Sequence, residues 1–225
     1  MIKGYEVWNE NLQKDMGFRK IGEKEVFTFR DMRSNYYEIL EDTCSRYPDK
    51  VVFCDNWNRE YTFRTFLQMV DDFAEYMQKV VGVQKKSHVG LLLHNSIEFC
   101  TSFYAICKIG AVAVPFPSKY REPEIRSLIE KADLDFLLCA EVFQSWACDY
   151  EEKGLHMIYS IDEENGFGFR HLNLPKGSRG NSKGQLTDEV IIMFTSGTTS
   201  ASKGVVLKNY HIIHAAMIYQ RLCEV

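Results

Sequence analysis

The apolar residues of this chain follow two spacings, which alternate along much of its length. Continuous apolar runs bounded by polar or turn residues are typical of strands buried on both faces of a parallel sheet. Between these runs, apolar residues recur at three- and four-residue steps, which indicates helices with one buried face. The pattern therefore predicts an α/β fold with a layered, mainly parallel sheet flanked by helices. The expected strands cover residues 51–54, 88–93, 111–115, 135–139 and 156–160.

The two longest helices are expected after the first two of these strands. Thr62 is a good N-cap for the first helix. The second is expected to begin at Asn95, because Asn95 and Glu98 have the spacing of a capping box, and to end at Gly110. The residues expected to face the core are Phe63, Phe66, Leu67, Val70, Phe73, Ala74, Met77 and Val81 in the first helix, and Ile97, Cys100, Phe103, Tyr104 and Cys107 in the second.

Two shorter helices are predicted from their end signals. Ser34 is the expected N-cap of a helix that Pro48 ends. Pro123 suits the first turn of another helix, where its missing N–H is not needed. The expected inward residues are Tyr37, Leu40, Cys44 and Tyr47 in the first of these helices, and Ile125, Leu128, Ile129 and Ala132 in the second.

The stretch 163–187 follows neither spacing. It holds several glycines and few apolar residues that could anchor it. It is therefore expected to be a long Gly-rich connection on the surface.

Composition excludes several classes of protein. The chain has 225 residues and a formal charge of −4, with both signs interspersed and no basic patch of the kind that binds nucleic acid. No apolar run reaches the length of a membrane span, so no integral membrane segment is expected, and the first residues lack the apolar core of a signal peptide. The seven cysteines are odd in number and show no Cys-x-x-Cys pair, which favours reduced thiols and a cytoplasmic protein.

A loop rich in hydroxyl groups is the main candidate for chemistry. An apolar run from Ile191 leads into the residues Thr195, Ser196, Gly197, Thr198 and Thr199, and Lys203 and a second apolar run follow. Small residues let backbone N–H groups approach an anion closely, hydroxyl groups add donors, and a lysine adds a point charge suited to phosphate. The composition of the loop therefore predicts that it holds phosphates.

The loop has two other interpretations, a Walker A motif and a plain hairpin loop. A Walker A motif requires Gly-Lys-Ser/Thr with the lysine opening a helix, but here Ser202 precedes Lys203 and a strand-like run follows. The loop is therefore expected to join two strands. A plain hairpin loop rich in Ser, Thr and Gly would show the same composition without binding anything.

The loop resembles the phosphate-loop signature of the adenylate-forming superfamily, which includes acyl-CoA synthetases, adenylation domains of peptide synthetases and beetle luciferases. That signature runs Thr-Ser-Gly-Thr-Thr-Gly-any-Pro-Lys-Gly. The chain matches it from Thr195 to Thr199 and at Lys203 and Gly204, and departs from it at Ser200 and Ser202. Residues 61–66, 93–99 and 107–115 resemble further family segments in the same order, so the resemblance covers about residues 35–212.

The resemblance implies the fold of the N-terminal domain of acyl-CoA synthetases, with residues 188–212 forming the phosphate-loop hairpin. Family members are longer, and the aspartate that holds the ribose and the C-terminal lid with its catalytic lysine come after the loop. Neither is present here. Residues 1–225 are therefore expected to be the N-terminal part of an AMP-binding adenylation domain that is inactive by itself, with the C-terminal half and the lid domain absent.

The mechanism that the resemblance implies is that of an ATP-dependent, AMP-forming carboxylate–CoA ligase. A small-molecule carboxylate attacks the α-phosphate of ATP, and the thiol of CoA then takes the acyl group. Thr195, Ser196, Gly197, Thr198 and Thr199 would hold the phosphates, and Lys203 would offset charge on the leaving group. Mg²⁺ would accompany ATP, with its protein ligand downstream. No catalytic residue is expected in this segment, and the nearby His211 and His214 are expected to bind no metal.

Two alternatives stay open. The chain could be a standalone nucleotide-binding or interaction module without catalysis. It could also belong to an adenylation domain whose acceptor is the thiol of an acyl-carrier protein, or oxygen, in place of CoA. The residues present here do not separate these acceptors.

Overall fold

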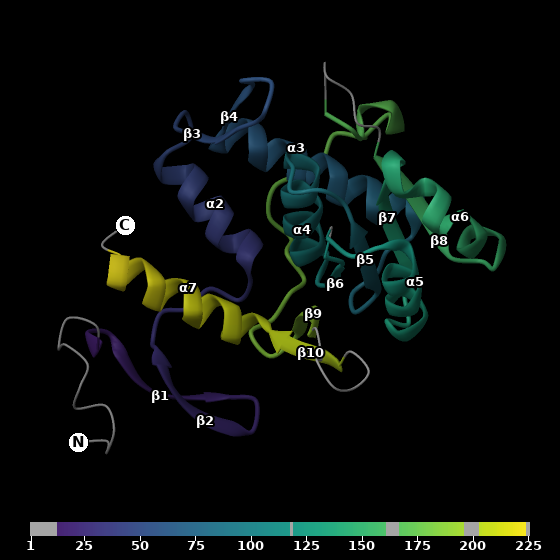
Figure 1. Ribbon diagram of the computed structural model, residues 1–225. Coiled ribbons are helices and arrows are strands. Elements are labelled where there is room, and N and C mark those ends of the chain that lie inside the picture. Colours follow the sequence, from purple (N-terminus) through teal and green to yellow (C-terminus); the bar gives the residue numbers. More distant parts are fainter. Residues whose placement is uncertain (1–12, 118, 161–166, 196–202, 224–225) are drawn as a thin grey trace.

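A six-stranded sheet forms the centre of the molecule in the computed structural model, which describes residues 13–117, 119–160, 167–195 and 203–223 (Figure 1). The strand order is β10-β9-β6-β5-β7-β8, and every neighbouring pair is parallel except β9 and β10. The predicted α/β fold with a mainly parallel sheet is confirmed. The strands are β5 (His88–Leu92), β6 (Val112–Pro115), β7 (Phe136–Ala140), β8 (His156–Ser160), β9 (Glu189–Thr195) and β10 (Lys203–Lys208).

Helices cover both faces of this sheet because its connections reverse direction. The chain passes from β5 through α4 to β6, and then returns over β5 through α5 to β7. Right-handed crossovers therefore place α4 and α5 on opposite faces. α3 and α2 pack on α4, whereas α6 packs beside α5, where Arg126 and Asp149 form a two-pronged ion pair at 2.8 and 2.6 Å. The helices are α2 (Tyr36–Arg46), α3 (Phe63–Tyr76), α4 (Ile97–Ile109), α5 (Glu122–Lys131) and α6 (Gln144–Glu152).

Two hairpins lie outside the main sheet. β3 (Val51–Cys54) pairs with β4 (Glu60–Thr62), so the first predicted strand exists but does not join the parallel sheet. β1 (Met16–Ile21) and β2 (Lys24–Phe29) form an N-terminal hairpin that was not predicted. In Figure 1 the long helix α7 (Asn209–Cys223) lies between this hairpin and α2. Phe29, Met32 and Ile213 form the buried centre of that contact.

Several predicted helix ends are off by one residue. The N-cap of α2 is Asn35, whose side chain accepts from the Glu38 N–H at 3.2 Å, and not Ser34. The N-cap of α4 is Ser96, and not Asn95. In both places two capping residues are adjacent, and the sequence alone does not say which one turns its side chain toward the helix. Thr62 and Gly110 are confirmed as caps.

The predicted inward faces are correct for most positions. In α3 the predicted apolar spacing marks the buried side of the helix as far as Met77. From Met77 to Val81 the helix widens into a π-turn, which ends at Gly82. In α4 the residues Cys100, Phe103 and Tyr104 are only half-buried, whereas Ala105, Ile106 and Cys107 are fully buried. Tyr47 was predicted to be buried and is 56 % exposed, since it follows the last turn of α2.

The connection between β8 and β9 is irregular and most of its described residues are exposed or half-buried, as predicted, but parts of it pack closely against α3. Within its described part, residues 167–187, Phe169 is fully buried and stacks on Phe73 of α3 with ring centroids 4.3 Å apart. Further along, the backbone of Gly177 passes directly over the backbone of Asp71. We call residues 176–184 the strap, because they cross α3 and then reach Asn35 at the start of α2 through Ser182 and Gly184.

A buried ion pair lies under the strap. The Asp71 carboxylate of α3 is fully buried and accepts from the Lys108 ammonium of α4 at 2.6 Å and from the Tyr37 hydroxyl of α2 at 2.7 Å. Lys108 also donates to the Ser178 carbonyl at 2.5 Å. Burial, together with the bond to Asp71, raises the pKa of Tyr37 well above its ordinary value. These contacts join three helices and the strap at one point.

The junction between α7 and the N-terminal hairpin is expected to weaken in mild acid. Burial lowers the pKa of His214, whose Nδ1 is hydrogen-bonded to the Thr28 hydroxyl at 2.7 Å. Because the folded state favours the neutral ring, this stability is present above the unfolded pKa of 6.5 and is lost as the pH falls through the lower folded value. The urea midpoint should therefore fall between about pH 7.5 and about pH 5.5.

The variant His214→Gln supplies the comparison, because glutamine can still accept from Thr28 but does not titrate. Its urea midpoint should change less than that of the parent over the same pH range. An equal change in both proteins would assign the acid sensitivity to other groups.

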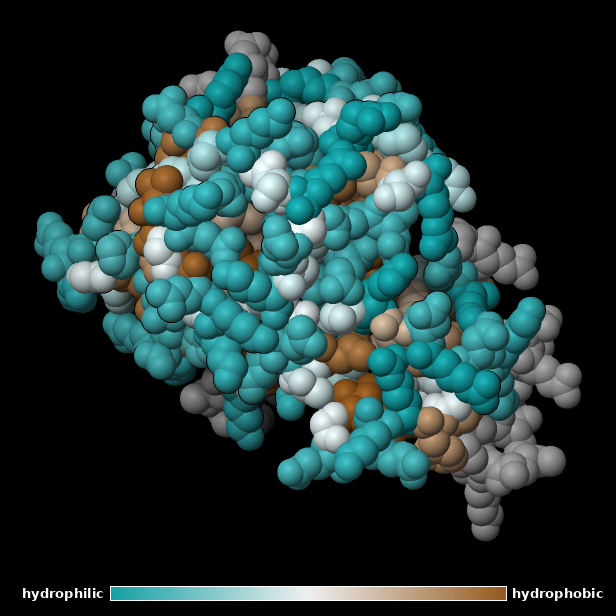
Figure 2. All heavy atoms as spheres, turned by 180° about the vertical axis from the view of Figure 1, so that it is seen from behind, coloured by the Kyte–Doolittle hydropathy of each residue, from teal (hydrophilic) through white to brown (hydrophobic). Residues whose placement is uncertain are grey.

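The surface of the described part is mostly hydrophilic on the face shown in Figure 2, where hydrophobic residues appear only in small groups. Among the described residues, no helix is long and apolar enough to cross a membrane.

Candidate functional site: the β9–β10 hairpin

The candidate site is built on the antiparallel pair β9 and β10. Thr195 at the end of β9 lies opposite Lys203 at the start of β10, and Met193 lies opposite Val205. The expectation that two strands flank the hydroxyl-rich loop is therefore confirmed, and a Walker A arrangement, which requires a helix after the lysine, is excluded. Of the predicted phosphate-binding residues, Ser196, Gly197, Thr198 and Thr199 lie outside the described residues.

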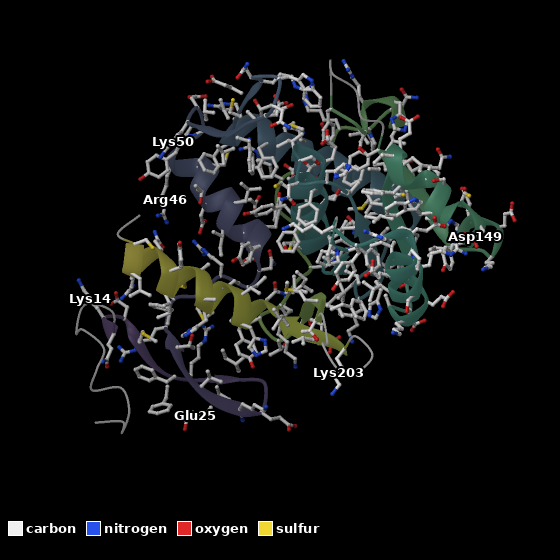
Figure 3. All side chains as sticks on the ribbon, viewed as in Figure 1. Lys14, Glu25, Arg46, Lys50, Asp149 and Lys203 are labelled. Atoms are coloured by element: carbon white, nitrogen blue, oxygen red, sulfur yellow. The ribbon has the colours of Figure 1, made fainter. Side chains whose placement is uncertain are left out.

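The mouth of the loop carries one hydroxyl and one ammonium group. The Thr195 hydroxyl donates to the Lys203 carbonyl at 3.4 Å, a long hydrogen bond across the last pair of the ladder. Both residues are exposed. Figure 3 shows Lys203 with its side chain pointing away from the body of the molecule. Among the described residues, no carboxylate forms an ion pair with this ammonium, so it is available to an anion from solution.

The hairpin projects from the edge of the sheet where ligands of α/β proteins bind. β9 runs parallel to β6 with Ile191 beside Ala113, so Thr195 lies at the same edge as the carboxyl ends of the other parallel strands. In open α/β sheets, ligands bind outside these carboxyl ends. The hairpin thus presents a donor and a positive charge at the edge where a ligand is expected.

The base of the hairpin is fixed by residues 185–188, a role that was not predicted. The Asp188 carbonyl accepts from the Asn209 N–H at 3.0 Å, and the Leu186 carbonyl accepts from the Tyr210 N–H at 3.1 Å. The Asp188 carboxylate pairs with Lys85 at 2.7 Å. No local spacing in the sequence signals these contacts, because they join segments far apart in the chain.

The start of α7 is held by Asn209, the first residue of the helix. The side-chain oxygen of Asn209 is buried without a hydrogen-bond partner in the described structure, although asparagine is a common helix cap. Its amide nitrogen donates instead to the Gln185 carbonyl at 2.9 Å. Asn209 therefore holds the helix to the base of the hairpin.

Gly204 is the second residue of β10 and packs against β9. A Cβ atom at this position would lie 3.2 Å from Ile192 Cγ2 and 3.5 Å from the Phe194 ring. The glycine therefore leaves room for these two side chains next to the loop. This gives a packing reason for the Lys-Gly pair that the sequence showed as a motif.

The two histidines of α7 do not act together. His211 Nδ1 accepts from the Lys208 N–H at 2.9 Å, whereas His214 contacts Thr28 of the N-terminal hairpin. Burial, with the charges of Lys208 and Lys24, lowers the pKa of His211. Among the described residues, no group of three or more His, Cys, Asp or Glu side chains could hold a metal ion.

Comparison with known proteins identifies the class. Residues 40–224 match the family model described as AMP-binding enzyme. The cyclochlorotine synthetase of Talaromyces islandicus is 26 % identical over 182 residues, covering 80 % of this chain and 3 % of its own length. The medium-chain fatty-acid–CoA ligase of Escherichia coli (strain K12) is 24 % identical over 233 residues. This match covers 93 % of this chain and 41 % of the ligase.

A solved structure gives the same result for the fold. The inhibitor-bound N-terminal domain of FACL13 from Mycobacterium tuberculosis superposes with a TM-score of 0.67 at 23 % identity, covering 79 % of this chain and 45 % of that one. The chain belongs to the AMP-binding enzyme family, the adenylate-forming superfamily. It spans less than half the length of each of these three relatives. Relatives of this kind include both CoA ligases and peptide synthetases.

Proposed function

We propose that this chain supplies the phosphate-holding hairpin of an enzyme that activates a carboxylate with ATP and transfers the acyl group to CoA. The observation that carries the proposal is the last pair of the β9–β10 ladder. It places Thr195 and Lys203 on opposite sides of the loop mouth, at the carboxyl edge of the sheet. Membership of the AMP-binding family supports ATP as the nucleotide.

The residues of the hairpin would act by position and charge. ATP would supply the adenylyl group that activates the carboxylate, and pyrophosphate would leave. The exposed Lys203 ammonium would lie against the outer phosphates and stabilise the negative charge that develops on the leaving pyrophosphate. The Thr195 hydroxyl would join the two strands at the point where the loop leaves the sheet. Mg²⁺ would accompany ATP, and we assign no ligand for it among the described residues.

The extent of the match supports CoA as the acceptor in this proposal. The alignment with the Escherichia coli CoA ligase covers 93 % of this chain, whereas that with cyclochlorotine synthetase covers 80 %. The second candidate is an adenylation domain that loads a carrier-protein thiol, which the peptide synthetases among the relatives favour. Exchange of labelled pyrophosphate into ATP, dependent on a carboxylate, tests the shared first step. Supplying CoA or a carrier protein then separates the two acceptors.

The variant Lys203→Ala should slow adenylation without unfolding the protein. The expected loss in the rate of pyrophosphate exchange is about 100-fold, because one charge-stabilising donor is removed from the transition state. The side chain is exposed, so the thermal midpoint should stay within about 2 °C of the parent value. Exchange should be measured on the native polypeptide isolated from its source cells.

The matched control is Lys208→Ala at the other end of β10. It removes the same charge from the same strand, far from the loop, and should leave the exchange rate near that of the parent. Equal losses of exchange rate in the two variants would show that the effect comes from the overall charge of the protein and not from the position of Lys203 at the loop. A lowered midpoint with normal exchange in Lys203→Ala would make Lys203 a structural residue.

A further inference from the structure

A cavity of about 690 Å³ opens at a second point along the carboxyl edge of the sheet. Leu93 follows β5, Ala140 ends β7 and Ser160 ends β8, and all three line this cavity. The chain leaves β5 toward β6 on one side and leaves β7 toward β8 on the other, so the sheet reverses its order between β5 and β7. Such a reversal is the usual ligand site of an open α/β sheet. The hairpin lies apart, since β6 separates β5 from β9, and none of its described residues lines the cavity.

The walls of the cavity combine a flat aromatic surface with a few polar groups. The β3–β4 hairpin contributes Phe53 and Trp57, and the first turn of α4 contributes Ile97 and Phe99. Trp57 is 41 % exposed, which is high for a tryptophan beside a cavity. The volume is within the range of small-molecule sites, and such sites are lined mainly by apolar and aromatic side chains. A ring-containing molecule fits these walls.

Arg59 supplies an unused donor at the wall. Its Nε donates to the Asp55 carboxylate at 2.5 Å, and its guanidinium lies 4.8 Å from the centre of the Trp57 ring. Its Nη1 is shielded from water and has no acceptor in the described part of the chain. A buried donor without an acceptor is unfavourable. Arg59 lines the cavity, and its side chain is 26 % exposed.

Asp55 cannot serve as that acceptor. Its two oxygens already accept from the Trp57 and Arg59 N–H groups, the Arg59 Nε and the Tyr61 hydroxyl. Burial raises the pKa of Asp55, but these hydrogen bonds outweigh burial and lower it overall. The carboxylate is therefore fully used in shaping the β3–β4 turn.

Glu98 supplies an acceptor in the same cavity. Its Oε1 accepts from the Gly168 N–H at 2.8 Å, and no hydrogen bond to its Oε2 is found within the described residues. Glu98 belongs to the first turn of α4 and Arg59 to the β3–β4 hairpin, and both residues line the cavity. The cavity wall thus offers one donor and one acceptor.

We propose that this cavity binds a neutral, flat aromatic molecule whose edge carries a carboxamide or lactam group. The carbonyl oxygen of that group accepts from Arg59, its N–H donates to Glu98, and the ring lies between the aromatic walls. An anionic ligand is disfavoured because it meets the Glu98 carboxylate. A cationic ligand such as an amidinium has only donors, so it leaves the Arg59 N–H without an acceptor. This charge preference separates the site from the hairpin, which offers a positive charge to phosphates.

Three small molecules of nearly equal shape test the proposal on the chain itself. Benzamide is neutral, benzoate is anionic and benzamidine is cationic. Benzamide should bind about tenfold more tightly than either charged analogue. Titration followed by amide NMR should shift the signals of Asn56, Trp57 and Asn95 at the cavity, and not those of β9 or β10. Equal or tighter binding of benzoate, binding elsewhere, or no binding of benzamide up to its solubility overturns the proposal.

The variant Glu98→Gln gives a reciprocal test. Glutamine keeps an oxygen for the Gly168 N–H and removes the negative charge, so the affinity for benzoate should rise about tenfold. Glu130→Gln, a carboxylate on α5 that does not line the cavity, is the control and should change nothing. An unchanged benzoate affinity in a folded Glu98→Gln protein contradicts the assigned role of Glu98. Neither experiment uses ATP or Lys203, so its result is independent of the adenylation assay.

Discussion

Gly177→Ala is expected to lower the free energy of unfolding by about 3 kcal/mol or more, as overpacking against rigid backbone does. A Cβ atom at residue 177 would lie 2.0 Å from the Asp71 carbonyl oxygen and 2.7 Å from the Asp72 nitrogen. Both atoms belong to the backbone of α3, so neither can turn away as a side chain would. The strap must therefore lift from the helix, which breaks the bonds that Gly177 and Ser178 make below it. Urea unfolding measures the loss.

Gly180→Ala is the matched control for this variant. Gly180 lies in the same strap with a positive φ of 74°, and a Cβ atom there would meet nothing within 4 Å. Alanine at this position adds backbone strain of about 1 kcal/mol but no collision. Gly177→Ala should therefore be clearly the less stable of the two. Similar losses would show that conformational strain, and not contact with α3, governs the strap.

Asp71→Ala is expected to destabilise the protein by about 3–5 kcal/mol, because it leaves a buried ammonium without its counter-charge. The Lys108 side chain is only 9 % exposed, so it cannot reach water without moving α4 or the strap. The Ser178 carbonyl and the face of the Tyr37 ring, 4.7 Å away, would be its main remaining partners. The measurement is again the free energy of unfolding in urea.

The double variant Asp71→Ala with Lys108→Met should be more stable than Asp71→Ala alone. Methionine fills much of the volume of the lysine stem and removes the charge that would otherwise stay unpaired. A coupling free energy near zero in this double-mutant cycle would mean that the two charges act independently and that the pair is not a unit. Far-UV circular dichroism confirms that each variant is folded before its unfolding is compared.

The elements of the central sheet could be predicted because their signals are local. The runs that became β5, β6 and β7 are mostly apolar, a pattern typical of strands buried on both faces, whereas β8 at the edge of the sheet is only partly buried. Helix positions followed from spacing, but the N-caps of α2 and α4 depended on a choice between neighbouring residues. α6 was not predicted, since its few buried residues, Ala147 and Tyr150 among them, do not form a continuous apolar stripe.

The N-terminal hairpin has one local signal in the sequence, the glycine of its turn. Gly22 and Glu23 form a two-residue turn between β1 and β2, and Gly22 has a φ of 61°. A glycine at the first position of such a turn is typical of a tight hairpin. The alternation along β1 and β2 is weak because much of this hairpin is exposed and its buried residues face α7. The sequence gives no hint of that distant partner.

The two candidate sites differ in how far sequence could locate them. The hairpin loop was found from its own residues, because hydroxyls, glycine and lysine lie together in the chain. The cavity joins Arg59, Glu98 and the ends of three strands, which only the order of the sheet brings together. The glycines of the strap predict a connection on the surface. At Gly177 the lack of a side chain serves instead to let two backbones touch.

The contact between the N-terminal hairpin and α7 has a consequence for synthesis on the ribosome. Thr28 and His214 are separated by 186 positions, so β2 leaves the ribosome long before the helix that covers it. Domains begin to fold from the N-terminus as they emerge. During that interval Phe29, which is fully buried in the finished protein, has no permanent cover. A nascent chain of this protein therefore carries an apolar surface that chaperones can bind until α7 arrives.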